Sequence, residues 1–427
     1  MPASRTERPR SARPRIAVVA LILLIVLGTA GSGRVAWVAT RPVGSTVRPQ
    51  QDRYLQQMLD DGGAEQMQTT FPEGFLFTQA LVGLAAAQPA EPGDADALAA
   101  VRRAEQALDS PAGRDRFAGQ TQPVNGVFWA GWSLLLAVER ARLSGTAADA
   151  QDVRARARPL MEALAADPDG FLESYPGRIW PVDNVVAVAA LARADTLVRV
   201  PGASTLVAAW PGRIARVRDP NTGLLPHSLN PDGTAAEGPR GSSQALILAF
   251  EPDVDPALAA TDYRAFVDTF VVRRIGLVGV REFPAGGHGD VDSGPLLFGV
   301  SATASAVALG AAARQQDEPL VEGLNAEAEL FGMPVTWHGA RRYGAGRLPV
   351  GDAFLAWARA QPVAPGATGS LDGLRPRWVL WGVVPLLPAL LLAALLGLLA
   401  RRRARRPPVD QPTDAEPRTA GPDPLTP

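Results

Sequence analysis

The sequence predicts an all-α protein, an (α/α)6 toroid of six inner and six outer helices flanked by two transmembrane helices. Three observations lead to this fold class. Strongly apolar helical stretches recur along the middle of the chain with a period of roughly 55 residues, which indicates a repeated supersecondary unit. Amphipathic stretches alternate with them, and an apolar segment long enough to cross a bilayer lies toward each end of the chain.

The composition narrows the class of protein. The chain has 427 residues, a formal net charge of −1, no Cys, and 42 Lys and Arg residues that are all Arg. This length is enough for a large core, whereas the near-neutral charge argues against the concentrated basic face of a nucleic-acid-binding protein. The absence of Cys excludes a cysteine nucleophile, a thiolate metal site and a disulfide framework. Because the net charge is close to zero, we expect no nucleic-acid partner.

The first element is a membrane segment. Residues 1–15 form an Arg-rich tail, and residues 16–38 begin with the apolar run "IAVVALILLIVLGTAGSG". A span needs roughly 20 apolar residues, and arginine clusters stay on the cytoplasmic side. We expect a transmembrane helix or signal anchor here. A cleaved signal peptide is the alternative, although no A-x-A-like cleavage site follows the run cleanly.

The last apolar element predicts a second span at residues 378–400, where "WVLWGVVPLLPALLLAALLGLLA" runs directly into "RRRARR". Because both arginine clusters then face the cytoplasm, residues 40–375 lie outside. The expected product is a two-pass protein of the cell membrane with both termini cytoplasmic and its main domain extracytoplasmic. Residues 401–427 are rich in Pro and Asp and are expected to form a disordered cytoplasmic tail.

The helices of residues 40–375 fall into two alternating kinds. Amphipathic stretches such as "RPQQDRYLQQMLDD" and "TDYRAFVDTFVVRRIG" belong on the outside, whereas helices that are apolar all round require burial. A ring of inner helices wrapped by outer ones satisfies both demands. An open α-solenoid is the alternative, but six units favour closure. The inner helices are predicted to start near residues 71, 125, 181, 241, 293 and 349.

In this architecture and loop layout, residues 48–360 resemble the six-hairpin glycosidase-like superfamily, whose members mostly act on carbohydrates. The motifs "YPGRIWPVDN", "RGSSQ", "GDVDSGP" and "LPVGDAF" look like those of uncharacterised membrane-anchored bacterial proteins. No catalytic signature of a named glycosidase family aligns residue by residue. The same toroid occurs in linalool dehydratase/isomerase-like proteins, whose cysteine chemistry is impossible in this chain. The resemblance implies an (α/α)6 toroid and a carbohydrate ligand.

The loops that enter the predicted inner helices are long and gather at one rim of a ring, whereas the loops that leave them, such as "QPAEPGD", are plainer. Long loops held by a rigid scaffold are where sites are usually built. The chemically active side chains of the entering loops are Glu73, Asn125, Tyr175, Arg178, Trp180, Asp183, His227, Arg240, Ser242, Ser243, Glu282, His288, Asp290, Asp292, Trp337, His338, Tyr343 and Asp352.

Acidic residues of this rim are the catalytic candidates. Glycoside cleavage needs one carboxylic acid to protonate the leaving oxygen and one carboxylate to activate water or attack. We predict that Asp183 and the loop holding Asp290 and Asp292 supply this pair, with Glu282 and Asp352 as substitutes. The alternative for the acids near helix starts is that they are caps, which bond the free N–H groups there. Asp290 stands further from its predicted helix, which favours function.

The predicted substrate-binding residues are Tyr175, Arg178, Trp180, Arg240, Ser242, His288 and Tyr343. Aromatic rings beside a Pro-Asp loop suit stacking on a sugar, and guanidinium groups suit an anionic or hydroxyl-rich ligand; the alternative is that the arginines form structural ion pairs with the acids. "DVDSG" lacks the EF-hand spacing, and the three histidines lack an HExxH-type spacing. We therefore predict no metal and no other cofactor.

The sequence as a whole predicts a membrane-anchored, extracytoplasmic glycoside hydrolase-like protein that acts on a cell-envelope carbohydrate. Two alternatives remain. One is a non-catalytic envelope protein that binds a glycan or a lipid through the same bowl, and the other is a lyase or isomerase for a small apolar substrate. A wide, acid-lined cleft flanked by aromatic rings favours the hydrolase, whereas an apolar bowl with its acids in ion pairs favours the lyase or isomerase.

Overall fold

The computed structural model describes residues 13–40, 46–167, 169–274, 276–290, 293–362 and 375–404. The chain divides into two compact units, one comprising Arg34–Leu380 and the other comprising Met1–Gly33 with Trp381–Pro427. The first unit holds the predicted toroid. The second holds most of the two apolar segments that are candidate membrane spans.

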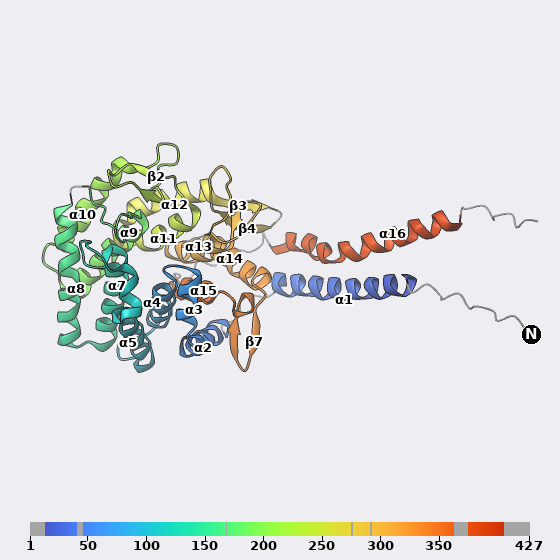
Figure 1. Ribbon diagram of the computed structural model, residues 1–427, viewed down its shortest axis with the longest axis horizontal. Coiled ribbons are helices and arrows are strands. Elements are labelled where there is room, and N and C mark those ends of the chain that lie inside the picture. The colour runs from blue at the N-terminus through green and yellow to red at the C-terminus, as the bar shows by residue number, and fades with distance from the viewer. Residues whose placement is uncertain are drawn as a thin grey trace, which may run out of the picture. The chain divides into compact units, whose positions relative to one another are not determined.

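Inner and outer helices alternate along the first unit (Figure 1). Within the described residues, the six inner helices are α4 (Gly74–Ala87), α7 (Gly126–Ser144), α9 (Pro181–Val198), α11 (Gly241–Phe250), α13 (Ala302–Arg314) and α15 (Pro349–Ala360). The six outer helices of the same residues are α2 (Val47–Asp60), α5 (Ala95–Asp109), α8 (Ala147–Ala166), α10 (Ala203–Ile214), α12 (Pro256–Phe270) and α14 (Glu318–Phe331). Shorter helices lie in the connections between them: α3 (Gly63–Thr70) and α6 (Pro111–Arg114), and the 3-10 helices η1 (Asp115–Phe117), η2 (Ala215–Val217), η3 (Glu251–Asp253) and η4 (Gly344–Gly346).

The inner helices form a closed ring. Each packs against the next one along the chain, and α15 packs against α4. The rings of Phe77 on α4 and Phe354 on α15 lie 5.2 Å apart. At the other end of these helices the side-chain amides of Gln88 and Gln361 exchange two hydrogen bonds of 3.1 and 3.0 Å. The predicted toroid is therefore confirmed, and the open solenoid is excluded.

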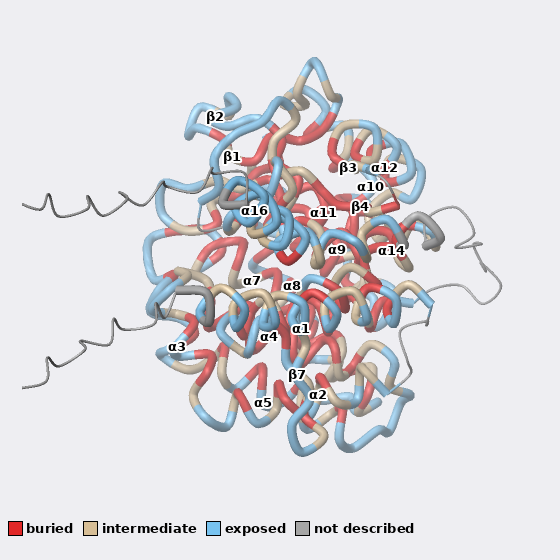
Figure 2. The backbone as a smooth tube through the Cα atoms, turned by 90° about the vertical axis from the view of Figure 1, so that its right-hand side faces the viewer, coloured by how far each residue is buried: buried red, intermediate tan, exposed pale blue. Residues whose placement is uncertain are grey.

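Aromatic side chains from several inner helices meet inside the ring. Trp132 of α7 lies 5.3 Å from Phe77 of α4 and 5.7 Å from Phe250 of α11, measured between ring centroids. Phe250 in turn stacks on Trp357 of α15 at 5.6 Å. Such pairs stabilise by their buried area and by edge-to-face contact. Figure 2 shows buried residues gathered along the inner helices and exposed residues on the outer turns.

Small residues allow the inner helices to pack closely. A Cβ added at Gly131 of α7 would lie 3.0 Å from the Cα of Ala187 on α9, and one at Gly310 of α13 would lie 3.2 Å from the Trp357 ring. A larger residue at either position would push neighbouring inner helices apart. The Ala- and Gly-rich composition of these helices thus follows from their place in the ring.

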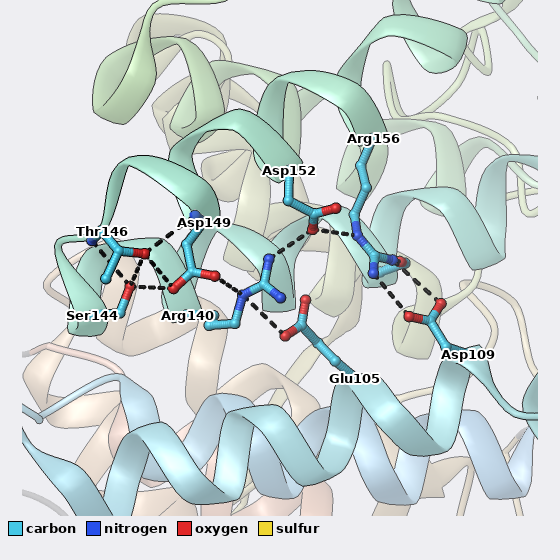
Figure 3. Close-up of polar contacts among 9 residues, drawn as sticks. Glu105, Asp109, Arg140, Ser144, Thr146, Asp149, Asp152 and Arg156 are labelled. Carbon is cyan, nitrogen blue, oxygen red and sulfur yellow. Dashed lines mark hydrogen bonds and ion pairs between the residues drawn. The ribbon is translucent and has the colours of Figure 1, made fainter.

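A polar network holds two outer helices to an inner helix (Figure 3). Arg140 of α7 bonds Glu105 of α5 at 3.3 Å and Asp152 of α8 at 2.6 Å. Arg156 of α8 donates to Asp109 of α5 at 2.8 Å and to Asp152 at 2.9 Å. Both arginines are mostly buried and each serves two helices, so the network fixes how α5 and α8 pack around α7.

Short strands interrupt the helices in the second half of the ring, and the sequence analysis did not predict them. They are β1 (Ser228–Leu229), β2 (Ala235–Glu237), β3 (Val271–Arg274), β4 (Leu277–Arg281), β5 (Leu296–Leu297), β6 (Val300–Ser301), β7 (Val335–Trp337) and β8 (Ala340–Arg342). β1–β2 and β7–β8 are antiparallel hairpins, and the antiparallel order of the remaining sheet is β3-β4-β6-β5.

The strands correct two predicted helices. The fifth inner helix starts at Ala302 rather than near 293, because Ser301 Oγ caps it by accepting a 3.0 Å bond from the Ala304 amide. Residues before it form the β5–β6 hairpin, whose turn includes Gly299 at a φ of 83°. The predicted outer helix "TDYRAFVDTFVVRRIG" ends at Phe270, because the β-branched Val271 and Val272 pair with β4 instead.

The second unit contains most of α1 (Arg13–Thr40), together with α16 (Leu387–Ala404), which follows η6 (Arg375–Leu386). Among the described residues, Ile16–Thr40 and Leu380–Arg402 are long and apolar enough to cross a membrane, judged by length and composition. These segments overlap the predicted spans 16–38 and 378–400. The predicted tails 1–15 and 401–427 lie largely outside the described residues, and the sidedness of the chain stays a prediction.

Candidate functional site

Entry loops place polar side chains at the N-terminal ends of the inner helices, and two clusters form there. We call the first the Tyr175 cluster (Glu73, Tyr175, Trp180 and Asp183). The second is the Arg240 cluster (Arg240, Ser242, Glu282 and Asp290).

The Tyr175 cluster is held by a loop that caps α7. The amide of Val127 in α7 donates a 2.9 Å bond to the carbonyl of Glu173, so the loop backbone satisfies one of the free donors of the helix start. This contact requires Gly126, which has a φ of 78° and whose added Cβ would lie 1.9 Å from the Ser174 carbonyl oxygen. A tight turn follows, closed by a 2.7 Å bond from the Ser174 amide to the Arg178 carbonyl.

Within this cluster the Tyr175 phenol lies among acidic groups. Tyr175 Oη donates to Glu73 Oε1 at 3.1 Å, and its ring packs against Trp180 with 4.9 Å between centroids. Burial raises the pKa of Tyr175 above its ordinary value, and the negative charges of Glu73 and Asp183 add to the effect. The phenol therefore stays a neutral hydrogen-bond donor. Two carboxyl groups from the starts of different inner helices, Glu73 ahead of α4 and Asp183 in the first turn of α9, thus act electrostatically on the same phenol.

The Arg240 cluster is held in a similar way, by a strand end that caps α11. The Gly241 amide donates a 2.8 Å bond to the Glu282 carbonyl. A Cβ at Gly241 would lie 1.9 Å from the Arg281 carbonyl oxygen, so only glycine allows the end of β4 to approach this helix. The close approach brings the side chain of Glu282 beside Arg240.

Arg240 joins two carboxylates of very different exposure. Its Nε donates to Glu282 Oε1 at 2.8 Å and its Nη2 to Asp290 Oδ1 at 2.8 Å, while Ser242 Oγ donates to the same Glu282 oxygen at 2.7 Å. Glu282 is fully buried, and among the described residues its Oε2 has no hydrogen-bond partner. The side chain of Asp290 is 45% exposed. One end of the cluster therefore reaches solvent.

The environment of Arg240 shifts the pKa values of two neighbouring groups, Asp290 and His227. Partial burial acts to raise the pKa of Asp290, but hydrogen bonds from Arg240 and Ser293 and the charge of Arg240 outweigh it and lower that pKa to about 2. Burial, assisted by the charge of Arg240, lowers the pKa of His227 to about 4. His227 Nδ1 lies 2.6 Å from Ser243 Oγ. Near neutral pH this region thus combines an ionised, half-exposed aspartate with a neutral imidazole.

Asp290 is not a helix cap. Its carboxylate accepts a 3.0 Å bond from the Ser293 amide within the loop and the bond from Arg240, whereas the cap of α13 is Ser301. Asp292, the other predicted acid of this loop, lies outside the described residues. Whether either acid works together with Asp183 stays a prediction.

Asp352 and Tyr343 belong to a different network, which we call the Arg359 cluster (Gln51, Glu329, Tyr343, Asp352 and Arg359). The Tyr343 amide donates to both Asp352 oxygens at 3.1 and 3.2 Å, and Gln51 Nε2 lies 3.4 Å from Oδ1. Tyr343 Oη bonds both Glu329 and Arg359. Burial raises the pKa of Asp352 to about 7. The cluster connects α15 to α2, to α14 and to Tyr343, the residue that follows β8, and we interpret it as a structural brace.

The remaining predicted site residues are either exposed on loops or part of a cluster already described. Arg178 and His288 are exposed on their loops, and Ser242 is part of the Arg240 cluster. Two further rim residues lie beside the predicted site residues: Glu73 accepts the Tyr175 hydrogen bond, and His227 lies within the electric field of Arg240. The signal that favours Glu73 is its position, directly ahead of an inner helix and after a proline.

A cleft of about 590 Å³ is lined by Glu173 and Ile179, on either side of the turn that holds Tyr175. Its walls come from the end of α8, from η2, from β1 and from the segment Phe171–Glu173, and include the charged Glu162, Asp167 and Arg216. None of the residues of the Tyr175, Arg240 or Arg359 clusters lines it. Within the part of the chain that is described, no group of three or more His, Asp or Glu residues is arranged to hold a metal ion.

No protein-family model matches the sequence, and no curated protein matches it. Among solved structures, one match is an unsaturated glucuronyl hydrolase whose title names the saccharide dGlcA-Glc-Rha-Glc. The alignment covers 70% of this chain and 86% of that chain, with 15% sequence identity and a TM-score of 0.45. The toroid is established by the packing of its own inner helices.

Proposed function

We propose that this chain is a membrane-anchored, extracytoplasmic glycoside hydrolase that acts on a carbohydrate of the cell envelope. The observation that carries the proposal is the Tyr175 cluster, in which the Tyr175–Trp180 aromatic pair lies beside the carboxyl groups of Glu73 and Asp183 at the N-terminal ends of inner helices. An aromatic surface suits stacking on a sugar ring, and the polar groups at its edge suit hydroxyl recognition.

The catalytic roles follow from the demands of glycoside cleavage. One carboxyl must protonate the leaving oxygen, and a second, ionised carboxylate must activate water or attack the sugar. In the proposed site Asp183, in the first turn of α9, gives the proton. Asp290, kept ionised by Arg240, is the carboxylate. Arg240 acts as a positioning residue, because it is itself buried and fixes the Asp290 side chain.

The membrane part of the proposal rests on two apolar helices and their flanking arginines. Ile16–Thr40 and Leu380–Arg402 are each long enough to span, and each has an arginine cluster on the side away from the toroid in the sequence. The positive-inside rule then leaves the toroid outside, facing envelope glycans. Such a location gives the rim a polymeric carbohydrate as its nearest substrate class.

One observation favours the two alternatives to a hydrolase, a non-catalytic carbohydrate-binding protein and a lyase or isomerase for a small apolar substrate. The carboxylates of Glu282 and Asp352 are engaged by Arg240 and by the Tyr343 backbone, respectively, so two of the five predicted acids act in the structure rather than toward a ligand. A protein that binds without cleaving would need only the aromatic surface and the exposed polar groups.

The test is hydrolysis of isolated envelope glycans by the full-length protein in detergent, followed as new reducing ends. Asp183→Asn should lower the rate by about 100-fold or more, as expected for loss of a general acid, with the melting temperature unchanged. The matched control is Asp195→Asn, which removes a carboxylate from the other end of the same helix, where it caps the amide of Val200. Glycan binding without cleavage by the wild type would favour the alternative, and equal loss of activity in both variants would contradict the role of Asp183.

A further inference from the structure

A stripe of apolar side chains on the first unit is exposed. It comprises Phe331 at the end of α14, Met333, and Val335 and Trp337 of β7; we call it the β7 stripe. Their exposed fractions are 57, 66, 43 and 70%, respectively. Val335 and Trp337 are two apart in β7 and therefore point to the same face of the strand, and Phe331 and Met333 precede them directly in the chain. Contiguous exposed apolar surface of this kind marks an interaction site.

The same end of α14 receives the chain as it leaves the first apolar segment. Arg34, near the end of α1, donates from Nε to the Leu330 carbonyl at 3.2 Å and from Nη2 to the Glu329 carbonyl. Counted from Ile16, roughly 20 residues fill the hydrocarbon core of a bilayer, which places Arg34 at the interfacial edge of that core. The carbonyls that hold Arg34 immediately precede Phe331. The start of the β7 stripe is thus tied to the interfacial end of a candidate span.

The second apolar segment is anchored on a neighbouring element. Trp378 is buried, and its Nε1 donates a 2.6 Å bond to the carbonyl of Gly276 in the β3–β4 turn. The candidate span begins at Leu380, two residues later. β4 packs against α14, where the Val278 amide donates to the carboxylate of Glu327. Both connections to apolar segments therefore meet the toroid at adjoining elements, α14 and β4.

We propose that the β7 stripe inserts into the headgroup region of the lipid bilayer, as a third attachment beside the two spans. We choose lipid as the binding partner because the hydrogen bonds of Arg34 hold the start of the β7 stripe beside the point where the chain leaves the candidate span. Trp is the residue that favours the boundary between headgroups and acyl chains. Arg342 pairs directly with Val335 across the hairpin, so it lies on the same face, and it is exposed to contact lipid phosphates. This inference rests on the proposed membrane anchoring.

The absence of Cys makes a direct test possible in the full-length chain. Trp337→Cys, labelled with an environment-sensitive fluorophore and reconstituted into phosphatidylcholine–phosphatidylglycerol vesicles, should show blue-shifted emission and reduced quenching by aqueous iodide. Val335→Cys repeats the measurement without removing the tryptophan, in case that substitution prevents folding. The matched control is Val124→Cys, whose residue is 65% exposed on a rim loop and should stay fully quenched.

A label at Leu23→Cys, within the first candidate span, separates the possible failures. If the labels at 23 and at 337 are both shielded from iodide, the inference holds. If the label at 23 is shielded but those at 335 and 337 are quenched like the control, the chain is anchored and the β7 stripe is open to another partner, so the inference is wrong. If the label at 23 is itself quenched, the membrane anchoring proposed above is wrong, and this inference falls with it.

Discussion

The Arg240 and Arg359 clusters use the same chemistry to different ends. In each, a buried arginine joins loop residues to an inner helix through carboxylates and a hydroxyl group. Around Arg359 the acidic groups Glu329 and Asp352 are enclosed, and Asp352 is held by backbone and amide donors. Around Arg240 one carboxylate, Asp290, reaches solvent, and one oxygen of the other, Glu282, has no hydrogen-bond partner among the described residues.

This difference shows how a brace and a candidate site are distinguished. A brace satisfies its polar atoms internally, because an unsatisfied buried group costs stability. A site keeps a charged group available to a ligand and tolerates an unsatisfied atom beside it. The pKa shifts have opposite signs in the two clusters, with the pKa of Asp290 lowered to about 2 and that of Asp352 raised to about 7.

The largest effect is expected from Arg240→Leu. It leaves the buried Glu282 charge without its partner, so the free energy of unfolding should fall by about 3–5 kcal/mol. Urea unfolding in detergent measures this loss. Arg178→Leu, at an exposed rim position, is the control and should change stability by about 0.5 kcal/mol or less. Adding Glu282→Leu to Arg240→Leu should recover much of the loss; if the single variant is as stable as the control, Arg240 does not hold the cluster together.

Asp352→Asn should remove a pH dependence. The folded-state pKa of about 7 lies above the unfolded value of 3.8, so this group stabilises the fold at low pH and the contribution is lost as the pH rises from about 4 to 7. The wild-type free energy of unfolding should therefore fall more steeply than that of the variant over this range, by up to about 1.4 kcal/mol per pH unit. Identical slopes in the two proteins would show that Asp352 is ionised in the fold.

Asp290→Asn should give the opposite sign and a smaller effect. The folded-state pKa of about 2 lies below 3.8, so Asp290 stabilises the fold above about pH 4 and this contribution is lost as the pH falls toward 2. Because the side chain is half exposed, solvent screening limits the effect to about 1 kcal/mol or less. Unfolding followed between pH 2 and 6 measures it. A wild type that loses stability relative to the variant as the pH rises would reverse this assignment.

The smallest effect is expected from Tyr175→Phe. The variant keeps the ring packed on Trp180 and loses only the hydrogen bond to Glu73, which costs about 0.5–1 kcal/mol at this half-buried position. If Tyr175 stacks on a sugar, the KM for glycan should change little while Tyr175→Ala raises it strongly. Equal KM values for Tyr175→Ala and the wild type would remove Tyr175 from the binding surface.

The sequence predicted the starts of the inner helices closely, with the exception of the fifth. The inner helices expected near 71, 125, 181, 241 and 349 begin at Gly74, Gly126, Pro181, Gly241 and Pro349, because periodic apolar residues and a Gly or Pro at the start determine them locally. The helix expected near 293 begins at Ala302 instead. The preceding apolar residues "PLLFGV" belong to the β5–β6 hairpin, and β6 pairs with β4. This long-range contact is not revealed by the helical pattern of the sequence.

The candidate site was predictable only in part for a related reason. Tyr175, Trp180 and Asp183 lie within nine residues of one another, so their proximity follows from a single loop and helix start. The partnership of Arg240 with both Glu282 and Asp290 depends on β4 reaching the start of α11. Asp352 has the same sequence context as a site acid, a glycine-preceded position in a helix's first turn, and its hydrogen bonds with the Tyr343 amide and with Gln51 could not be foreseen from that context.

The central claim, that the Arg240 cluster serves catalysis and the Arg359 cluster serves the fold, is tested most directly by comparing Asp290→Asn with Asp352→Asn. The measurement is the rate of glycan hydrolysis per folded molecule of the full-length protein, at a temperature where both variants are folded. Asp290→Asn should lose about 100-fold or more of the wild-type rate, while Asp352→Asn should keep it. An unchanged rate in Asp290→Asn, with the loss falling on Asp352→Asn instead, would contradict the claim.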